Sequence, residues 1–186
     1  PQNAAMITDG PGSGTWKPNV LGGRSNPGKV NKLNGLLFGC GVDANVEETI
    51  QTTTSGEIAG MIIEPIQGVG GFIVPPKAYF PRVHEIVKKY GGLYISDEVQ
   101  GGVGRTGTHW FGVLHNGIVP DIITMAKGFG NGATIGGLIT RDEIADSMKG
   151  KIHFNTYAGN PWATLQAAET LSILEEENVR EKAAQY

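Results

Sequence analysis

The chain has little of what marks several protein classes. Cysteine occurs once in 186 residues, at Cys40, which excludes an internal disulfide framework and a site of several thiolates. Lysine and arginine (15) are fewer than aspartate and glutamate (18), so there is no basic excess of the kind that binds nucleic acid. No hydrophobic run approaches the ~20 residues that cross a bilayer. We expect a soluble intracellular protein, either cytoplasmic or in the mitochondrial matrix.

Glycine is abundant, with 29 residues, and residues 1–45 hold many of them beside proline and asparagine. Such a composition is typical of turns, so we expect residues 1–45 to be irregular, with one short strand at 35–38. The sequence does not begin with methionine and both ends resemble cuts, so we expect a partial sequence.

Residues 46–186 show strand and helix patterns in alternation. Apolar runs predict strands, and apolar residues spaced three and four apart predict helices. The expected strands are 58–63, 93–96, 121–126 and 135–139, and the expected helices are 77–90, 141–148 and 161–177. This rhythm predicts an α/β fold with a mostly parallel sheet. Ligands bind at the carboxyl ends of the strands in such sheets, where Glu64, Asp97 and Lys127 fall.

Lys127 is the most informative residue, because one lysine ends an apolar strand and a glycine-rich turn follows it. We expect it to be buried at the strand end, where desolvation favours the neutral amine and makes it a usable nucleophile. Its small neighbours, Ala126, Gly128 and Gly130, leave room for a flat, bulky group.

Asp97 ends the preceding strand. Two interpretations fit a carboxylate and an amine at neighbouring strand ends. The pair forms either a buried ion pair or a pyridoxal phosphate (PLP) site, in which the lysine bonds the cofactor and the aspartate pairs with the ring nitrogen. Val99 would present an apolar face to the ring, and Gln100 an amide to its hydroxyl. Glu98 points the other way and is expected to be a structural ion-pair member.

Residues 102–107 match the dinucleotide-binding pattern GxGxxG, but 108–112 do not begin a helix as that motif requires. No phosphate-binding P-loop sequence occurs, and the four histidines lack metal-ligand spacing, so we expect no metal. Thr156 either caps a turn or binds a phosphate.

Taken together, these segments resemble the class III (subgroup II) PLP-dependent aminotransferases. The matching segments run in the family's order: 64–68, 97–100 with 104–107, 120–122, 125–128 with 130–132, and 155–157 with 159–161. Within the family, the residues of these segments are most similar to those of the alanine–glyoxylate aminotransferase 2 branch. The resemblance implies the central part of a fold type I large domain, without the small C-terminal domain. Residues 1–45 would be an irregular segment of that domain and 46–186 its central part.

The resemblance also implies roles for individual residues. Lys127 would form the Schiff base with PLP and shuttle a proton, and Asp97 would pair with the ring nitrogen. Val99 would back the ring and Gln100 contact its hydroxyl. Thr156 would reach the cofactor phosphate of the neighbouring subunit in a homodimer, and Glu64 would gate the substrate carboxylate.

The reaction implied is transfer of an amino group from an amino acid or ω-amine to an oxo acid such as glyoxylate or pyruvate. Two alternatives stay open. The protein would be a PLP-dependent aminomutase or decarboxylase of the same fold, since the family includes such members. Alternatively, the chain as given would be an inactive fragment, because it lacks half of the cofactor site found in the family. Departures from the family pattern at 101–103, 133–135 and Ala158 change loops beside the site.

Overall fold

The structure is a computed structural model that describes residues 5–9, 36–68, 71–153 and 155–186, with side chains from residue 45 onward. The chain forms two compact units, each described by itself. The first holds the described residues up to Ile95 and Asn116–Ile118. The second holds Ser96–His115 and the chain from Val119 to Tyr186. The division falls within one strand, so that strand contributes residues to both units.

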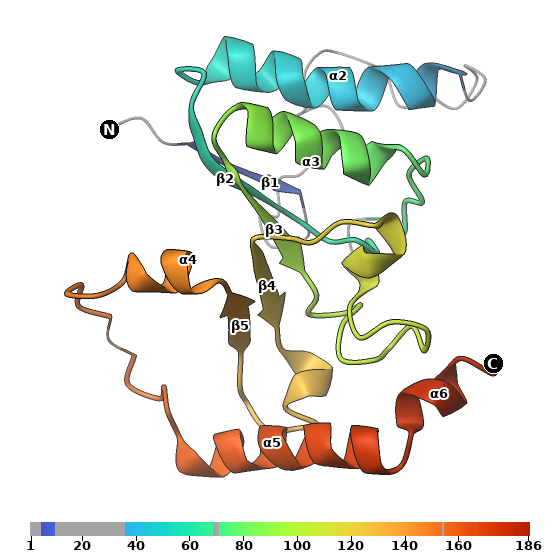
Figure 1. Cartoon of the computed structure of the whole chain (residues 1–186), viewed down its shortest axis with the longest axis vertical. Helices are drawn as coiled ribbons and strands as arrows, with labels where there is room; N and C mark the ends of the chain where they lie inside the picture. Colours follow the sequence, from blue (N-terminus) through green and yellow to red (C-terminus); the bar gives the residue numbers. More distant parts are fainter. Residues whose placement is uncertain (1–4, 10–35, 69–70, 154) are drawn as a thin grey trace. The chain divides into compact units, whose positions relative to one another are not determined.

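The first unit is a parallel sheet with two helices beside it (Figure 1). Its elements are β1 (Ala5–Asp9), α2 (Leu36–Thr53), β2 (Ile58–Ile63), α3 (Tyr79–Lys89) and the start of β3 (Leu93–Asp97). The strand order runs β1-β2-β3. β1 and β2 pair in parallel, with Met6 opposite Gly60 and Asp9 opposite Ile63. This is the βαβ rhythm that the sequence predicts.

Apolar faces of α2, α3 and β2 form the core of the first unit. The fully buried side chains include Val46, Ile50, Met61, Ile63, Val83, Val87 and Tyr94. Helix α3 ends where Gly91 adopts a positive φ of 74°, a conformation that glycine accepts without a Cβ clash. The amide of Gly92 then donates to the carbonyl of Val87 at 2.9 Å and closes the helix end.

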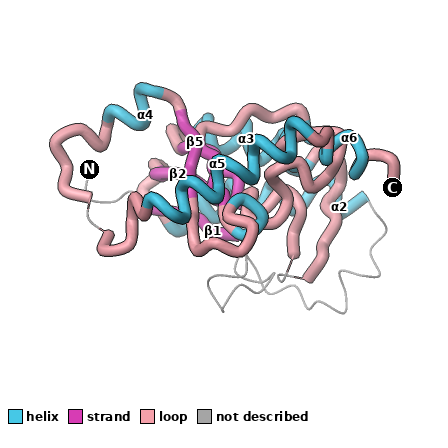
Figure 2. Tube along the Cα trace, turned by 90° about the horizontal axis from the view of Figure 1, so that it is seen from below, coloured by secondary structure: helices cyan, strands magenta, loops and turns pink. Residues whose placement is uncertain are grey.

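The second unit contains the end of β3 and most of the residues of interest. It also holds the 3₁₀ helix η2 (Gly112–Asn116) except its last residue, which belongs to the first unit. The remaining elements are β4 (Ile122–Met125), the 3₁₀ helix η3 (Lys127–Phe129), β5 (Gly137–Thr140), α4 (Asp142–Asp146), α5 (Pro161–Glu176) and α6 (Val179–Ala183). The strand order is β3-β4-β5. β5 runs antiparallel to β4, with Ile122 opposite Thr140 and Met125 opposite Gly137. Helix α4 follows β5 after one residue (Figure 2).

An ion pair joins the beginning of β4 to the end of β5. Arg141 Nη2 lies 2.7 Å from the buried Oδ1 of Asp121, and the hydroxyl of Thr140 donates to the Asp121 carbonyl at 2.8 Å. The buried carboxylate is thus paired at the antiparallel edge.

Most elements confirm the sequence prediction, but residues 1–45 differ from it. The four strands and three helices expected after residue 46 are all present, within three residues of their expected ends. The irregular structure expected for 1–45 was wrong where the structure describes it. β1 occupies Ala5–Asp9, and α2 begins at Leu36 and continues past residue 45. The strand expected at 35–38 was wrong from Leu36 onward, because that apolar run belongs to a helix of 18 residues.

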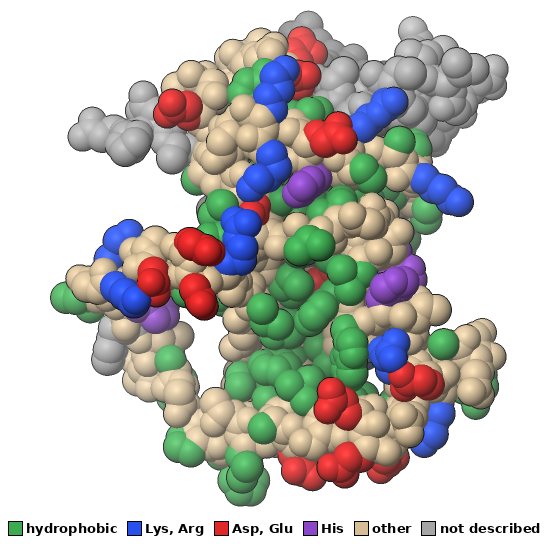
Figure 3. All heavy atoms as spheres, viewed as in Figure 1, with side chains coloured by type: hydrophobic (Ala, Val, Ile, Leu, Met, Phe, Trp, Pro, Cys, Tyr) green, Lys and Arg blue, Asp and Glu red, His purple; other side chains and the backbone are tan. Residues whose placement is uncertain are grey.

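Helix α5 buries a different face from the one its leucines indicate. The sequence pattern groups Leu165, Ala168, Leu171 and Leu174, yet the buried residues of α5 are Ala163, Ala167 and Thr170. Leu165 is 66% exposed. Small side chains let this helix approach a glycine-rich loop closely, so the leucine-containing face lies outward. The run Glu175–Glu177 is exposed as expected, and Figure 3 shows acidic side chains along α5 at the bottom of the view.

Among the helices in the described part of the chain, none is long and apolar enough to pass through a membrane.

Candidate active site

The carboxyl ends of β3 and β4 lie next to each other in the second unit. The amide of Glu98, just after β3, donates to the carbonyl of Thr124 in β4 at 2.9 Å. The arrows of β3 and β4 point the same way in Figure 1. Since neighbouring parallel strands end at the same edge, Asp97 and Lys127 share one edge of the sheet.

Asp97 is a half-buried carboxylate on the last residue of β3. Its Oδ1 accepts a hydrogen bond from the amide of Val99 at 3.1 Å, which fixes the side chain in a tight turn. A carboxylate has two oxygens and about four lone-pair sites, so Asp97 keeps acceptor capacity for a further N–H donor. Val99 and Gln100, which continue the turn, are also half-buried.

The adjacent carboxylate, Glu98, has a structural task. It is 1% exposed and points away from Asp97, because successive side chains alternate along an extended chain. Oε1 accepts from the amide of Val113 at 2.8 Å and from the hydroxyl of Ser96 at 3.0 Å, and Oε2 accepts from the amide of Gly112 at 2.9 Å. Glu98 therefore caps the first amides of η2. The structural role was expected, but these partners are hydrogen-bond donors and not an opposite charge.

Lys127 follows β4 by two residues and opens η3. Its φ is +47°, a left-handed conformation that costs a non-glycine residue about 1–3 kcal/mol. Such strain clusters at functional positions, which supports a role for this lysine. The expected burial was wrong, because Lys127 is exposed. β4 ends at Met125, so Lys127 lies beyond the strand, where its side chain reaches solvent.

The loop after Lys127 is held by hydrogen bonds at each turn. The amide of Gly130 donates to the carbonyl of Lys127 at 3.0 Å, and that of Ala133 to the carbonyl of Gly130 at 2.9 Å. A Cβ on Gly130 would overlap the carbonyl of Ala133 and lie 2.7 Å from Ile135 Cγ2, so only glycine fits. From α5, Gln166 Nε2 donates to the carbonyls of Gly130 at 3.0 Å and Asn131 at 2.8 Å.

Sequence reasoning missed Gln166. A signal was present, since Ala163, Gln166, Ala167 and Thr170 have the spacing of one helix face and only Gln166 in that set is long and polar.

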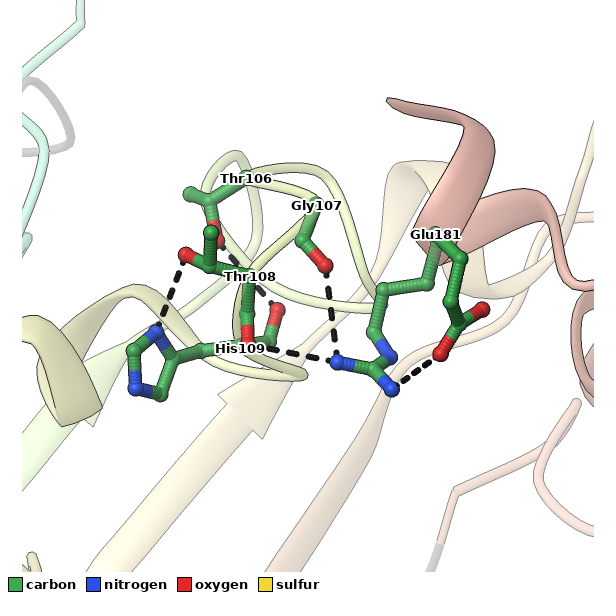
Figure 4. Close-up of polar contacts among 6 residues, drawn as sticks. Thr106, Gly107, Thr108, His109 and Glu181 are labelled. Carbon is green, nitrogen blue, oxygen red and sulfur yellow. Dashed lines mark hydrogen bonds and ion pairs between the residues drawn. The ribbon is translucent and has the colours of Figure 1, made fainter. Parts of the chain in front are cut away.

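The turn with the GxGxxG pattern does not lead into an α-helix, as the sequence predicted. It is instead covered by α6. The guanidinium of Arg180 donates to the carbonyls of Thr108 at 3.2 Å and Gly107 at 3.4 Å and also pairs with Glu181 (Figure 4). The same group lies 5.6 Å from the centre of the Trp110 ring. Arg180 thus fixes the turn downstream of Asp97.

Thr156 lies in the exposed segment between α4 and α5. The neighbouring Asn155 accepts a hydrogen bond from the amide of Tyr157 at 3.0 Å, and Asn160 caps α5 by accepting from the amide of Trp162 at 3.0 Å. Asparagines therefore do the local capping in this segment, and the exposed Thr156 hydroxyl remains available for another task.

Glu64 belongs to the first unit. It follows β2, is 4% exposed, and Oε2 accepts the amide of Gly68 at 3.1 Å. In the described residues no group of three or more histidine, cysteine or acidic side chains could hold a metal ion.

Comparison with known proteins places this chain in a family. The family model described as aminotransferase class-III matches residues 33–186. Alanine–glyoxylate aminotransferase 2 homolog 2, mitochondrial, of Arabidopsis thaliana is 40% identical over 185 residues, covering 98% of this chain and 39% of the relative. The human alanine–glyoxylate aminotransferase 2, mitochondrial, is 44% identical over 136 residues, which are 73% of this chain and 26% of the relative.

A solved Bacillus anthracis aminotransferase is similar with a TM-score of 0.72 and 38% identity, over 80% of this chain and 34% of that one. The chain thus spans well under half the length of the relatives it matches. The expected fold class, a fragment of an α/β large domain with a mostly parallel sheet, is confirmed. The family model, the relatives and the fold agree, and the chain belongs to the class-III aminotransferase family.

Proposed function

We propose that this chain is the central part of the PLP-binding large domain of a transaminase. Residues 46–186 would carry the polar side chains of the site, and 1–45 would belong to the same domain. The whole protein would move an amino group from an amino acid or ω-amine to an oxo acid such as glyoxylate or pyruvate. The observation that carries the proposal is Lys127, held in a left-handed conformation at the same sheet edge as Asp97.

The residues at this edge fit PLP by their chemistry. A primary amine extends beyond β4, a half-buried carboxylate with acceptor capacity ends β3, and an apolar side chain and an amide follow it. These groups suit an aldehyde, a protonated ring nitrogen, a ring face and a ring hydroxyl. The glycines after Lys127 leave space beside it, since the nearest atom to a Cβ on Gly128 would be Arg105 Nη2 at 3.6 Å.

When bound, PLP supplies an aldehyde that takes up the amino group and a ring that withdraws electrons from the substrate α-carbon. Lys127 would hold the cofactor through its amine and would carry the proton between the substrate α-carbon and the cofactor C4′. Asp97 would keep a proton on the ring nitrogen, because a carboxylate stabilises the positive charge there. Val99 would exclude water from one ring face, and Gln100 would orient the ring through a hydrogen bond to its hydroxyl.

Two further assignments complete the proposal. Glu64 would gate the substrate carboxylate. Thr156 would donate its hydroxyl to the cofactor phosphate of a second subunit in a homodimer. Exposed apolar side chains flank Thr156 and support an interface there: Ile152 (98%), Tyr157 (84%) and Trp162 (76%). We propose an intracellular location, cytoplasmic or mitochondrial.

The test of the proposed function compares purified full-length protein with its Lys127→Ala variant. Wild type should convert an amino donor to its oxo acid in the presence of PLP, and Lys127→Ala should lose at least a hundredfold of that rate. Lys151→Ala, which removes an exposed lysine of the same unit, serves as the matched control. Release of carbon dioxide without amino transfer would identify a decarboxylase instead. An unchanged rate in Lys127→Ala would refute the assignment.

A further inference from the structure

Gln166 is a polar side chain on the packed face of α5. Its helix neighbours on that face, Ala163, Ala167 and Thr170, are buried, and Gln166 itself is half-buried. A long polar side chain on such a face costs free energy unless its polar atoms are hydrogen-bonded. The amide nitrogen of Gln166 meets this requirement through the loop that follows Lys127.

Both hydrogen bonds use the same end of the side chain. Nε2 donates to the carbonyl of Gly130 at 3.0 Å and to that of Asn131 at 2.8 Å. A carbonyl oxygen only accepts, so the NH₂ group must face the loop, and its two hydrogens match the two acceptors. The side chain therefore clamps two consecutive carbonyls of the loop to α5.

The clamped residue connects directly to Lys127. The amide of Gly130 donates to the Lys127 carbonyl at 3.0 Å, while the carbonyl of the same glycine accepts from Gln166. Lys127 and Asn131 both have positive φ values, of 47° and 43°, which are unfavourable for residues with a Cβ. A backbone with two such residues within five positions persists only where surrounding contacts hold it.

We propose that Gln166 is a positioning residue that holds the Lys127 loop in the conformation from which the amine reaches the cofactor. The proposal rests on the proposed function of Lys127, and it adds a residue whose side chain acts through the loop. Gln166 restrains Gly130 and Asn131, Gly130 restrains the Lys127 carbonyl, and the strained backbone of Lys127 fixes the direction of its side chain.

The test uses a donor series at position 166 in the full-length protein. Gln166→Met keeps the length and has no donor. Gln166→Glu keeps the shape of the side chain, but its carboxylate oxygens only accept hydrogen bonds and cannot bond the loop carbonyls. Gln166→Lys supplies an ammonium that can donate to both. Glu169→Met, on the exposed side of α5, is the matched control.

The first measurement is amide hydrogen exchange in protein without cofactor. Loss of two neutral hydrogen bonds predicts about tenfold or faster exchange in the loop peptide 127–133 of the Met and Glu variants. Exchange in the Lys variant should stay within about threefold of wild type, and Glu169→Met should show no change. Exchange within α5 itself should not rise in any variant that folds, which separates a clamp from general loss of helix stability.

The second measurement is the rate at which PLP becomes borohydride-trappable on Lys127. We expect the Met and Glu variants to attach PLP at least tenfold more slowly than wild type and Glu169→Met. Unchanged loop exchange in both variants would overturn the clamp. Faster loop exchange with an attachment rate within twofold of wild type would overturn the positioning role.

If wild type attaches no PLP at Lys127, the proposed function fails and the positioning role fails with it, while the exchange data still report on the clamp. If Gln166→Met does not fold, as judged by far-ultraviolet circular dichroism, the Glu and Lys variants give the same donor comparison.

Discussion

Glu98 and Asp97 are adjacent carboxylates with different tasks, and this difference gives the sharpest stability prediction. Glu98 is 1% exposed and accepts three hydrogen bonds, two of them from the backbone amides of Gly112 and Val113. Glu98→Ala removes all three and leaves two buried amides without their acceptor. At about 1–3 kcal/mol for each unsatisfied group, the free energy of unfolding should fall by about 4 kcal/mol.

Glu98→Gln should lower the free energy of unfolding by only about 2 kcal/mol. Its amide oxygen can replace Oε1, but its NH₂ group then faces the Gly112 amide, so one hydrogen bond becomes a contact between two donors. Urea unfolding of the purified protein, followed by circular dichroism and tryptophan fluorescence, measures both losses. Glu169→Gln, an exposed control, should change stability by less than about 0.5 kcal/mol. A loss below about 1 kcal/mol for Glu98→Ala would refute the buried capping role.

Three other predictions concern the loop, the cofactor and pH. Gly130→Ala should destabilise the protein by about 1–3 kcal/mol in urea, because its Cβ has no room, whereas Gly128→Ala should be tolerated, because its Cβ would come no closer than 3.6 Å to Arg105 Nη2. Asp97→Asn should still bind PLP but transaminate about a hundredfold more slowly, measured as oxo-acid formation; an unchanged rate would contradict its pairing with the ring nitrogen. Hydrogen bonds from Lys89 and Tyr90 lower the pKa of Glu47 below its usual 4.5, so its stabilisation is present above pH 4.5 and lost as pH falls through the lower folded value. The hydrogen bond to Glu47 raises the pKa of Lys89 above 10.5, so that contribution is present below pH 10.5 and lost as pH rises through the higher folded value. In Glu47→Gln the urea midpoint should therefore change less with pH than in wild type, both below pH 4.5 and above pH 10.5. Identical pH profiles of the two proteins would contradict a stabilising interaction between Glu47 and Lys89.

Local patterns predicted the parts of the fold that depend on local physics. The run 58–63 is apolar and bounded by polar residues, and β2 has those bounds. Pro161 fits the first position of a helix, and α5 begins there with Asn160 as its cap. The position of Lys127 directly after an apolar strand was also visible in the sequence.

The parts that depend on tertiary contacts were missed or misjudged. The leucines of α5 suggested its core face, but close approach to the loop at Gly130 favours the alanine face. The role of Gln166 depends on two carbonyls about 35 residues earlier, which no local pattern contains. Burial of Lys127 was inferred from its strand, although the strand ends before it.

The most direct test of the account is where PLP attaches. Full-length protein incubated with PLP, reduced with borohydride and digested should yield one modified peptide, and its fragmentation should place the cofactor mass on Lys127. The same treatment of Lys127→Ala should leave that peptide unmodified. Attachment at a different lysine, or equal labelling of several exposed lysines, would contradict the assignment of Lys127 as the residue that holds the cofactor.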